Sequence, residues 1–145
     1  KNYYLGYPWP GDEYILRLMR KDALLAWYGK LHETARVEGT IGRLTALLTH
    51  DTHRTLEEMV TKTNEWSEAE ANLRFDAGHP PIVWWRFIRV MLTAFFDSFI
   101  KQGGWRAGTA GWIESIYQAF SIFITYAKLW ELQKQIRAIR TNPTN

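Results

Sequence analysis

Several residue types and motifs that commonly form catalytic or metal sites are missing from this chain of 145 residues. It has no cysteine, which excludes a disulfide framework and any metal site built on thiolates, and which fits a reducing compartment. No glycine-rich phosphate loop, no Ser/His/Asp set and no zinc-ligand spacing occurs in it. Residues 1–11 lack the continuous apolar stretch of a signal peptide. The residues that could carry chemistry are therefore few.

The chain has low hydropathy overall but many aromatic residues. Its mean hydropathy is −0.32, so the chain as a whole is not a bundle of transmembrane helices. Aromatic residues nevertheless make up 15% of it, and five of its eight tryptophans lie after residue 81. Tryptophan favours membrane–water interfaces, because its ring is largely apolar while its N–H stays hydrated. The tryptophans therefore indicate an interfacial C-terminal region.

Charge is distributed as unevenly as the tryptophans. Residues 82–145 contain eight Lys or Arg and three Asp or Glu, a net charge of +5. Residues 1–81 contain ten Lys or Arg and twelve Asp or Glu, a net charge of −2. A basic, aromatic region favours an anionic lipid surface as its partner. Nucleic acid is the other usual partner, but these cations are spread among large aliphatic residues and no nucleic-acid motif is present. We therefore expect membrane lipid, and no nucleic acid, as a partner.

The first third of the sequence predicts short strands. Residues 1–11 contain two prolines and two glycines and are expected to form a loop. Apolar, β-branched and aromatic residues in partial alternation then predict strands at 13–20, 24–28, 31–37 and 43–49. The glycines between the last two strands suit a hairpin-like turn.

A capped helix is expected next, over residues 55–79. Thr55 and Glu58 have the spacing of a capping box, in which the threonine caps the helix and the glutamate reaches back. Apolar residues recur every three or four positions from Leu56 through Trp66 to Leu73, which predicts one apolar face. The sequence Gly-His-Pro-Pro then ends the helix, because proline cannot continue it.

Two apolar segments follow, at 82–100 and 112–132, with a glycine-containing turn between them. Each is close to the roughly 20 residues that a bilayer-spanning helix needs. Both also carry charges, and a charge at mid-membrane depth costs about 3 kcal/mol, which disfavours simple spanning. The polar tail 133–140 is expected to continue the second helix.

Polar residues form one narrow stripe on each of these predicted helices. They recur every three or four positions from Arg86 to Lys101 and from Glu114 to Lys128, which leaves a wide apolar surface. Such helices can lie in a membrane interface, or pair with their stripes facing each other, so that Lys101 meets Glu114. Core helices of a soluble bundle are the alternative, since apolar stripes are usually core. In the membrane interpretation the contact residues are Trp84, Trp85, Phe95, Phe96, Trp105, Trp112, Phe120, Phe123 and Trp130.

Three groups of polar residues are candidates for chemistry. His50 and His53 flank a carboxylate and could bind a divalent cation, although polar residues before a helix often serve as caps. Glu33 could act as a general base if it lies near a substrate hydroxyl, and is otherwise a surface acid. Arg17 and Arg20 could hold a diphosphate, or are ordinary exposed arginines on a strand.

Five segments follow one another in an order that is typical of one protein family. They are LRLMR (16–20), LHE (31–33), EGTIGRL (38–44), LLTHDTHRTLEEMVTKTNEW (47–66) and KQGGWRAGTAGWIESIYQAFSIFITYAKLWELQ (101–133). This order resembles the C-terminal region of family 2 glycosyltransferases of the lipopolysaccharide-core type. In that group an RLFR-like strand precedes a V/L-His-Glu motif, and two apolar helices end in a YAKLWEL-like signature, the most specific of these matches.

The resemblance implies a GT-A type enzyme at the cytoplasmic face of the bacterial inner membrane, peripheral or re-entrant. Such an enzyme transfers a sugar from a nucleotide-sugar to a lipid-linked or glycan acceptor, with Mg²⁺ or Mn²⁺. By this resemblance Glu33, next to His32, takes the acidic position that acts as the base or holds the acceptor. His50 matches a histidine of metal or diphosphate binding, and Arg17 and Arg20 match the arginines of the strand motif.

We therefore expect an α+β chain that is mainly α. Residues 1–54 would form the edge of a GT-A sheet, 55–79 a connecting helix, and 80–145 a membrane-associated helical hairpin with a basic tail. The Rossmann-like half and its Asp-x-Asp metal motif do not occur in this sequence, and 76–81 has no counterpart in the family pattern. The chain alone is therefore expected to be inactive. The alternative is a non-catalytic, membrane-bound helical subunit of a larger assembly.

Overall fold

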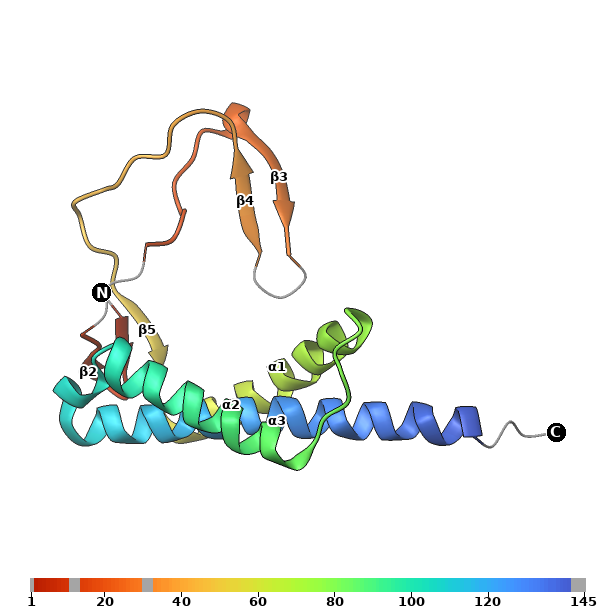
Figure 1. The fold of residues 1–145 in the computed structure, drawn as a ribbon. Coiled ribbons are helices and arrows are strands. Elements are labelled where there is room, and N and C mark those ends of the chain that lie inside the picture. The colour runs from red at the N-terminus through yellow and green to blue at the C-terminus, as the bar shows by residue number, and fades with distance from the viewer. Residues whose placement is uncertain (1, 11–13, 30–32, 142–145) are drawn as a thin grey trace.

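The chain folds into a layer of helices with a long arm projecting from it (Figure 1). The computed structural model describes residues 2–10, 14–29 and 33–141, without the side chains of residues 53 and 139–141. The chain is mainly α with short strands, as predicted. The elements are β1 (Asn2–Tyr4), β2 (Tyr7–Pro8), β3 (Leu24–Tyr28), β4 (Thr34–Val37), β5 (His50–His53), α1 (Leu56–Asp76), α2 (Trp84–Phe96) and α3 (Gly108–Thr141).

A three-stranded sheet in the order β2-β1-β5 lies beside the start of α1. The loop predicted for 1–11 is wrong where it is described, because Leu5 and Gly6, with φ of 51° and 78°, turn β1 tightly into antiparallel β2. β5, at a position where the sequence predicts no strand, pairs in parallel with β1. Trp9 is buried beside the ring of Tyr4, at 4.9 Å between centroids, and anchors this sheet.

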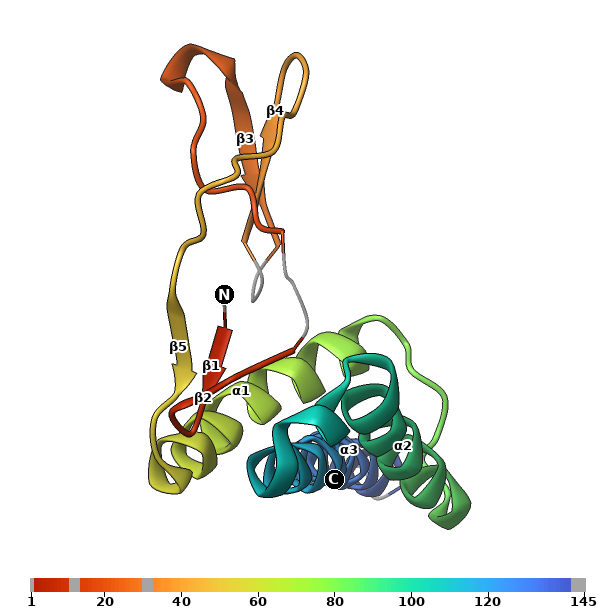
Figure 2. The same cartoon turned by 90° about the vertical axis from the view of Figure 1, so that its left-hand side faces the viewer.

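The described residues of the arm are 14–29 and 33–49, and they include the antiparallel pair β3–β4 (Figure 2). The strand predicted at 24–28 is confirmed, and the one predicted at 31–37 is found at Thr34–Val37. Strands predicted at 13–20 and 43–49 are wrong, since no described residue of either segment belongs to a strand. The hairpin-like turn predicted between 31–37 and 43–49 is also wrong. β4 pairs with β3 instead of with residues 43–49.

The start and end of α1 agree with the sequence prediction. The Glu58 amide donates to Thr55 Oγ1 at 3.1 Å, and the Glu58 carboxylate accepts from the Arg54 amide at 3.1 Å. The glutamate thus reaches back one residue further than an ordinary capping box requires. The helix ends at Asp76, and Gly78 follows with a positive φ of 71° before the two prolines.

The buried face of α1 differs from the predicted apolar face. Leu56 and Trp66 are about half exposed, at 54% and 48%. The buried residues recur every four positions instead, and most of them are small or polar: Met59, Thr63, Ser67 and Ala71. Small side chains let α1 approach α3 closely, and hydroxyl groups meet polar partners there.

The two apolar segments form an antiparallel helical hairpin, as predicted. α2 passes into a π-helical turn, Asp97–Lys101, and a short 3₁₀ turn, Gly104–Ala107, leads into α3. The predicted turn therefore ends earlier than expected, because α3 already begins at Gly108. The predicted continuation of the second helix through the polar tail is confirmed, since α3 extends to Thr141.

The polar stripes of the two helices do not face each other. Lys101 forms its ion pair with Asp97 one turn earlier, so the predicted meeting with Glu114 is wrong. The stripe on α3 faces α1 instead, where Lys128 Nζ donates to the main-chain oxygen of Asn64 at 2.5 Å. α1 also supplies Thr63, whose hydroxyl meets those of Tyr117 and Ser121 on α3.

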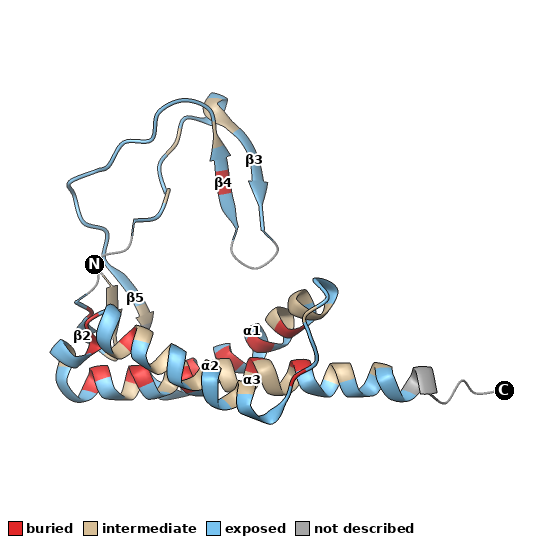
Figure 3. Cartoon of the chain, viewed as in Figure 1, coloured by how far each residue is buried: buried red, intermediate tan, exposed pale blue. Residues whose placement is uncertain are grey.

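The core lies where α1 and α2 pack on opposite sides of α3 (Figure 3). Ala71, Ile82 and Leu129 form its centre, and partly buried aromatic rings pack around them. Figure 3 shows buried residues concentrated along the helices, whereas the arm is almost entirely exposed or intermediate. The helical layer is therefore the self-supporting part of the structure.

Candidate functional site

The two arginines of the expected phosphate site lie in the extended segment that leads to β3. Arg17 and Arg20 are both exposed. Arg20 lies 3.5 Å from the carboxylate of Asp22, and the two side chains are 81% and 73% exposed. A pair that is so exposed contributes little to stability. The guanidinium groups are therefore accessible to an anionic ligand.

Glu33 lies directly before β4, at the end of the arm's hairpin, and its side chain is exposed. His32 lies outside the described residues. Among the described positions, Glu33 is the carboxylate nearest in sequence to the hairpin loop. Because Thr34, the next residue, pairs with Tyr28, the strands fix where the Glu33 carboxylate leaves the main chain.

His50 is the first residue of β5 and is also exposed. It pairs with Asn2 in the parallel ladder, which sets it beside the N-terminal strands. The side chain of His53 lies outside the described part of the chain. Among the described side chains, no group of three or more His, Asp or Glu could hold a metal ion. His50 would therefore contribute at most a part of a metal site.

The structure does not bring Glu33 and His50 together in one sheet. Glu33 precedes a strand of the two-stranded arm, whereas His50 belongs to the three-stranded sheet. In both Figure 1 and Figure 2 the arm rises away from the helices, while β5 runs down toward α1. Glu33 and His50 are therefore candidate residues on two different sheets.

An open groove lies where β5 leads into α1, and sequence reasoning did not identify it. Its walls carry both signs of charge, and Lys62 Nζ donates to the main-chain oxygen of Thr52 across it at 3.0 Å. The only sequence signal for it was the polar run before the helix cap. The lining residues are Asp51, Thr52, Arg54, Thr55, Glu57, Glu58, Thr61 and Lys62.

The aromatic residues predicted to contact a membrane fall into two classes. Phe95 and Phe123 are half-buried between α2 and α3, where Phe123 meets Phe87 with ring centroids 5.6 Å apart. The other seven are exposed: Trp84, Trp85, Phe96, Trp105, Trp112, Phe120 and Trp130. Within the described residues, no helix combines the length and the hydropathy needed to cross a membrane.

Comparison with known proteins identifies a distant relative. The chain is 30% identical over 106 residues to the lipopolysaccharide core biosynthesis glycosyltransferase LpsC of Rhizobium meliloti (strain 1021). The aligned region is 70% of this chain and 38% of that protein, so the chain spans well under half of its relative. No protein-family model and no solved structure matches the chain. The resemblance predicted from the sequence is thus supported at the level of a distant, glycosyltransferase-related homologue.

Proposed function

We propose that this chain is the acceptor-side and membrane-docking part of a glycosyltransferase. The enzyme would move a sugar from a nucleotide-sugar to a lipid-linked or glycan acceptor, at the cytoplasmic face of a bacterial inner membrane. The observation that carries the proposal is the similarity to a lipopolysaccharide core glycosyltransferase over 106 residues. The aligned region covers 70% of this chain.

The exposed apolar side chains of the arm also support a larger catalytic unit. A two-stranded hairpin is marginally stable alone, and a contiguous exposed apolar surface usually contacts another protein surface. We propose that a nucleotide-sugar-binding domain covers the arm, since the relative is much longer than the aligned region. The large apolar residues exposed on the arm include Leu18, Leu25, Trp27, Ile41, Leu44, Leu47 and Leu48.

In the proposed reaction Glu33 accepts the proton of the acceptor hydroxyl. The acceptor oxygen forms a bond to the anomeric carbon of the sugar, and the bond from that carbon to the diphosphate breaks. Arg17 and Arg20 would bind the diphosphate through charge-assisted hydrogen bonds. Mg²⁺ or Mn²⁺ would accompany the donor, but the described side chains provide no complete ligand set for it.

The test uses the full protein that carries this chain, a panel of nucleotide-sugars, and Mg²⁺ or Mn²⁺. Replacing Glu33 by Gln should lower kcat by about 100-fold or more, because a general base typically contributes that much, while donor binding is kept. Glu38→Gln is the matched control, since Glu38 is an exposed acid at the other end of β4. Unchanged turnover in Glu33→Gln would refute the assignment of the base.

A second candidate is a non-catalytic, membrane-bound helical subunit of a larger assembly. The observation in its favour is the exposed row of aromatic residues on α2 and α3. Binding of the same panel of nucleotide-sugars, measured with and without metal, separates the two candidates. A full protein that binds none of the nucleotide-sugars, with or without metal, would favour the subunit.

A further inference from the structure

One face of α2 is unusually rich in exposed apolar side chains. Trp84, Ile88, Leu92 and Phe96 follow one another every four residues, so they lie in one row along the helix. Trp84 is 76% exposed and the other three are each 52% exposed. Exposed apolar rows of this length are uncommon on monomeric soluble proteins and usually mark a binding surface.

A second exposed row continues this surface onto α3. Trp112, Ile116 and Phe120 are also spaced by four residues and are exposed. Aromatic rings connect the two rows, since Phe95 lies 5.5 Å from Phe96 and 5.7 Å from Trp112 between centroids. We call these seven residues of the two rows, together with Trp85, the aromatic face.

Cations accompany the tryptophans around this face. Arg86 and Arg89 lie 5.6 and 5.9 Å from the ring of Trp85. Arg106 lies 5.0 Å from the ring of Trp105, and Lys134 lies 5.2 Å from the ring of Trp130. Among the described residues none of these four cations has a carboxylate partner.

Three of these four cations are exposed. Arg89, Arg106 and Lys134 are open to solvent, whereas the Nε atom of Arg86 is buried without a hydrogen-bond partner among the described groups. Hydrogen bonds from cationic groups to anionic acceptors are strong. The three exposed cations are thus available to bind anions from outside the protein.

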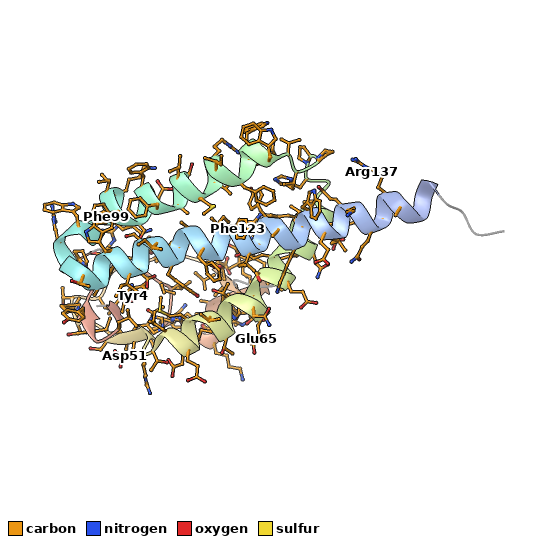
Figure 4. The ribbon with its side chains drawn as sticks, turned by 90° about the horizontal axis from the view of Figure 1, so that it is seen from below. Tyr4, Asp51, Glu65, Phe99, Phe123 and Arg137 are labelled. Carbon is orange, nitrogen blue, oxygen red and sulfur yellow. The ribbon has the colours of Figure 1, made fainter. Side chains whose placement is uncertain are left out.

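Acidic side chains gather on the opposite flank of the layer. α1 contains six acids and two Lys or Arg, a balance of −4 (Glu57, Glu58, Glu65, Glu68, Glu70 and Asp76 against Lys62 and Arg74). Figure 4 shows α3 between α1 and α2, so the acidic helix lies away from the aromatic face of α2. Phe99 and Phe123 mark the seam between α2 and α3 in that view. Negative charge is therefore concentrated on α1, and α2 carries only positive charges.

We propose that α2 and the first half of α3 lie flat on an anionic lipid bilayer through the aromatic face. The tryptophans and aliphatic residues enter the headgroup region, and the positive charges of Arg86, Arg89 and Arg106 attract lipid phosphates. The acidic α1 faces water. This inference deepens the membrane-docking part of the proposed function by naming the surface, its orientation and its lipid class.

A bilayer fits this face better than a second copy of the chain does. A symmetric dimer through the same patch would place the cations of one copy against the equally cationic patch of the other. Like charges facing each other are unfavourable, whereas an anionic surface is complementary to them. An in-plane arrangement also needs no helix that can cross the membrane.

The absence of cysteine allows a clean test with one introduced label. An environment-sensitive fluorophore is attached to Leu92→Cys on the aromatic face, or to Leu44→Cys on the arm as the control. Both leucines are exposed. With vesicles of phosphatidylcholine and phosphatidylglycerol, the emission from position 92 should shift to the blue and be quenched by brominated lipid. The emission from position 44 should not change.

Charge variants test the lipid class. Arg86→Gln with Arg89→Gln should weaken binding to the mixed vesicles by about fivefold for each residue, as expected for a cation near an anionic membrane. Arg36→Gln with Arg43→Gln removes the same charge from the arm and should have a smaller effect. Circular dichroism verifies that all variants keep their helices.

Three results would overturn the inference. They are an unshifted label at position 92, equal losses in the two charge variants, or a shift without vesicles that grows with protein concentration and so reveals self-association. Vesicle binding is measured without donor or acceptor. If the protein binds vesicles as predicted but transfers no sugar, only the proposed transferase activity is refuted. If it transfers sugar but does not bind vesicles, only this inference is refuted.

Discussion

At the scale of single residues, the Tyr117 hydroxyl ties α3 to α1. It donates to the main-chain oxygen of Met59 at 2.6 Å and also meets the Thr63 hydroxyl. Burial raises the pKa of Tyr117 above its ordinary value of 10.0, the hydrogen bond with Thr63 opposes this, and the charge of Glu114 adds to the rise. The folded protein therefore favours the neutral phenol.

The raised pKa of Tyr117 predicts a loss of stability in alkali. Below pH 10 the phenol is neutral in both states, so its contribution is fully present. Above the ordinary pKa of 10.0 the unfolded state ionises more readily, so the free energy of unfolding falls as pH rises through the higher folded-state pKa. Urea unfolding between neutral and strongly alkaline pH measures this fall.

Tyr117→Phe should lower the free energy of unfolding at neutral pH by about 1 kcal/mol, the typical value of a hydrogen bond. It should also remove the part of the alkaline fall that comes from this phenol. Tyr28→Phe, at an exposed position on the arm, is the control and should change neither quantity. An unaltered alkaline fall in Tyr117→Phe would refute the explanation.

At the scale of the elements, close backbone contact joins the end of α2 to the start of α3. A Cβ atom added at Gly111 would lie 1.8 Å from the main-chain oxygen of Gly104. Gly104 in turn packs against the ring of Trp9, where an added Cβ would lie 3.0 Å away. The Ser98 and Ser115 hydroxyls hydrogen-bond at 3.1 Å in the same joint. Glycine is thus required where the N-terminal sheet meets the helical hairpin.

Gly111→Ala should destabilise the protein by about 1–3 kcal/mol, as overpacking of a tight contact does. The backbone must shift, because the atom in conflict belongs to the main chain and not to a flexible side chain. Gly42→Ala is the matched control, since nothing lies within 4 Å of an added Cβ there. Equal urea midpoints for the two variants would contradict the proposed joint.

At the scale of the whole molecule, the helical layer and the arm differ in how they are stabilised. The layer has a core between three helices, whereas almost every side chain of the arm is exposed (Figure 3). A segment with few buried contacts opens at low free energy. The arm is therefore expected to open at lower free energy than the layer.

Hydrogen exchange of this chain alone should distinguish the two parts. The amides of β3 and β4 should exchange much faster than those in the middle of α1, α2 and α3, because a two-stranded hairpin is marginal in water. In the full protein, the proposed donor-binding domain should slow exchange in the arm while leaving the helices unchanged. Equal protection of arm and helices in the chain alone would refute this view.

Sequence spacing predicts which side chains share one face of a helix, but not how distant segments meet. The apolar residues of α2 from Trp84 to Phe96 recur every four positions, and this repeat alone places them in one row. Whether Glu33 and His50 serve one site depends on how two separate sheets are arranged, and sequence spacing carries no such information. The Glu33 and His50 assignments stay predictions.

The sequence by itself determined the local features of this protein. Thr55 and Glu58 start α1, Gly78 and the two prolines end it, and apolar periodicity defines the helical hairpin, because these effects act within one turn of the chain. The tertiary structure alone decided which faces meet and which strands pair. β5 pairs with β1, and the polar stripe of α3 faces α1, because in both cases the partners lie about 50 to 60 residues apart in sequence.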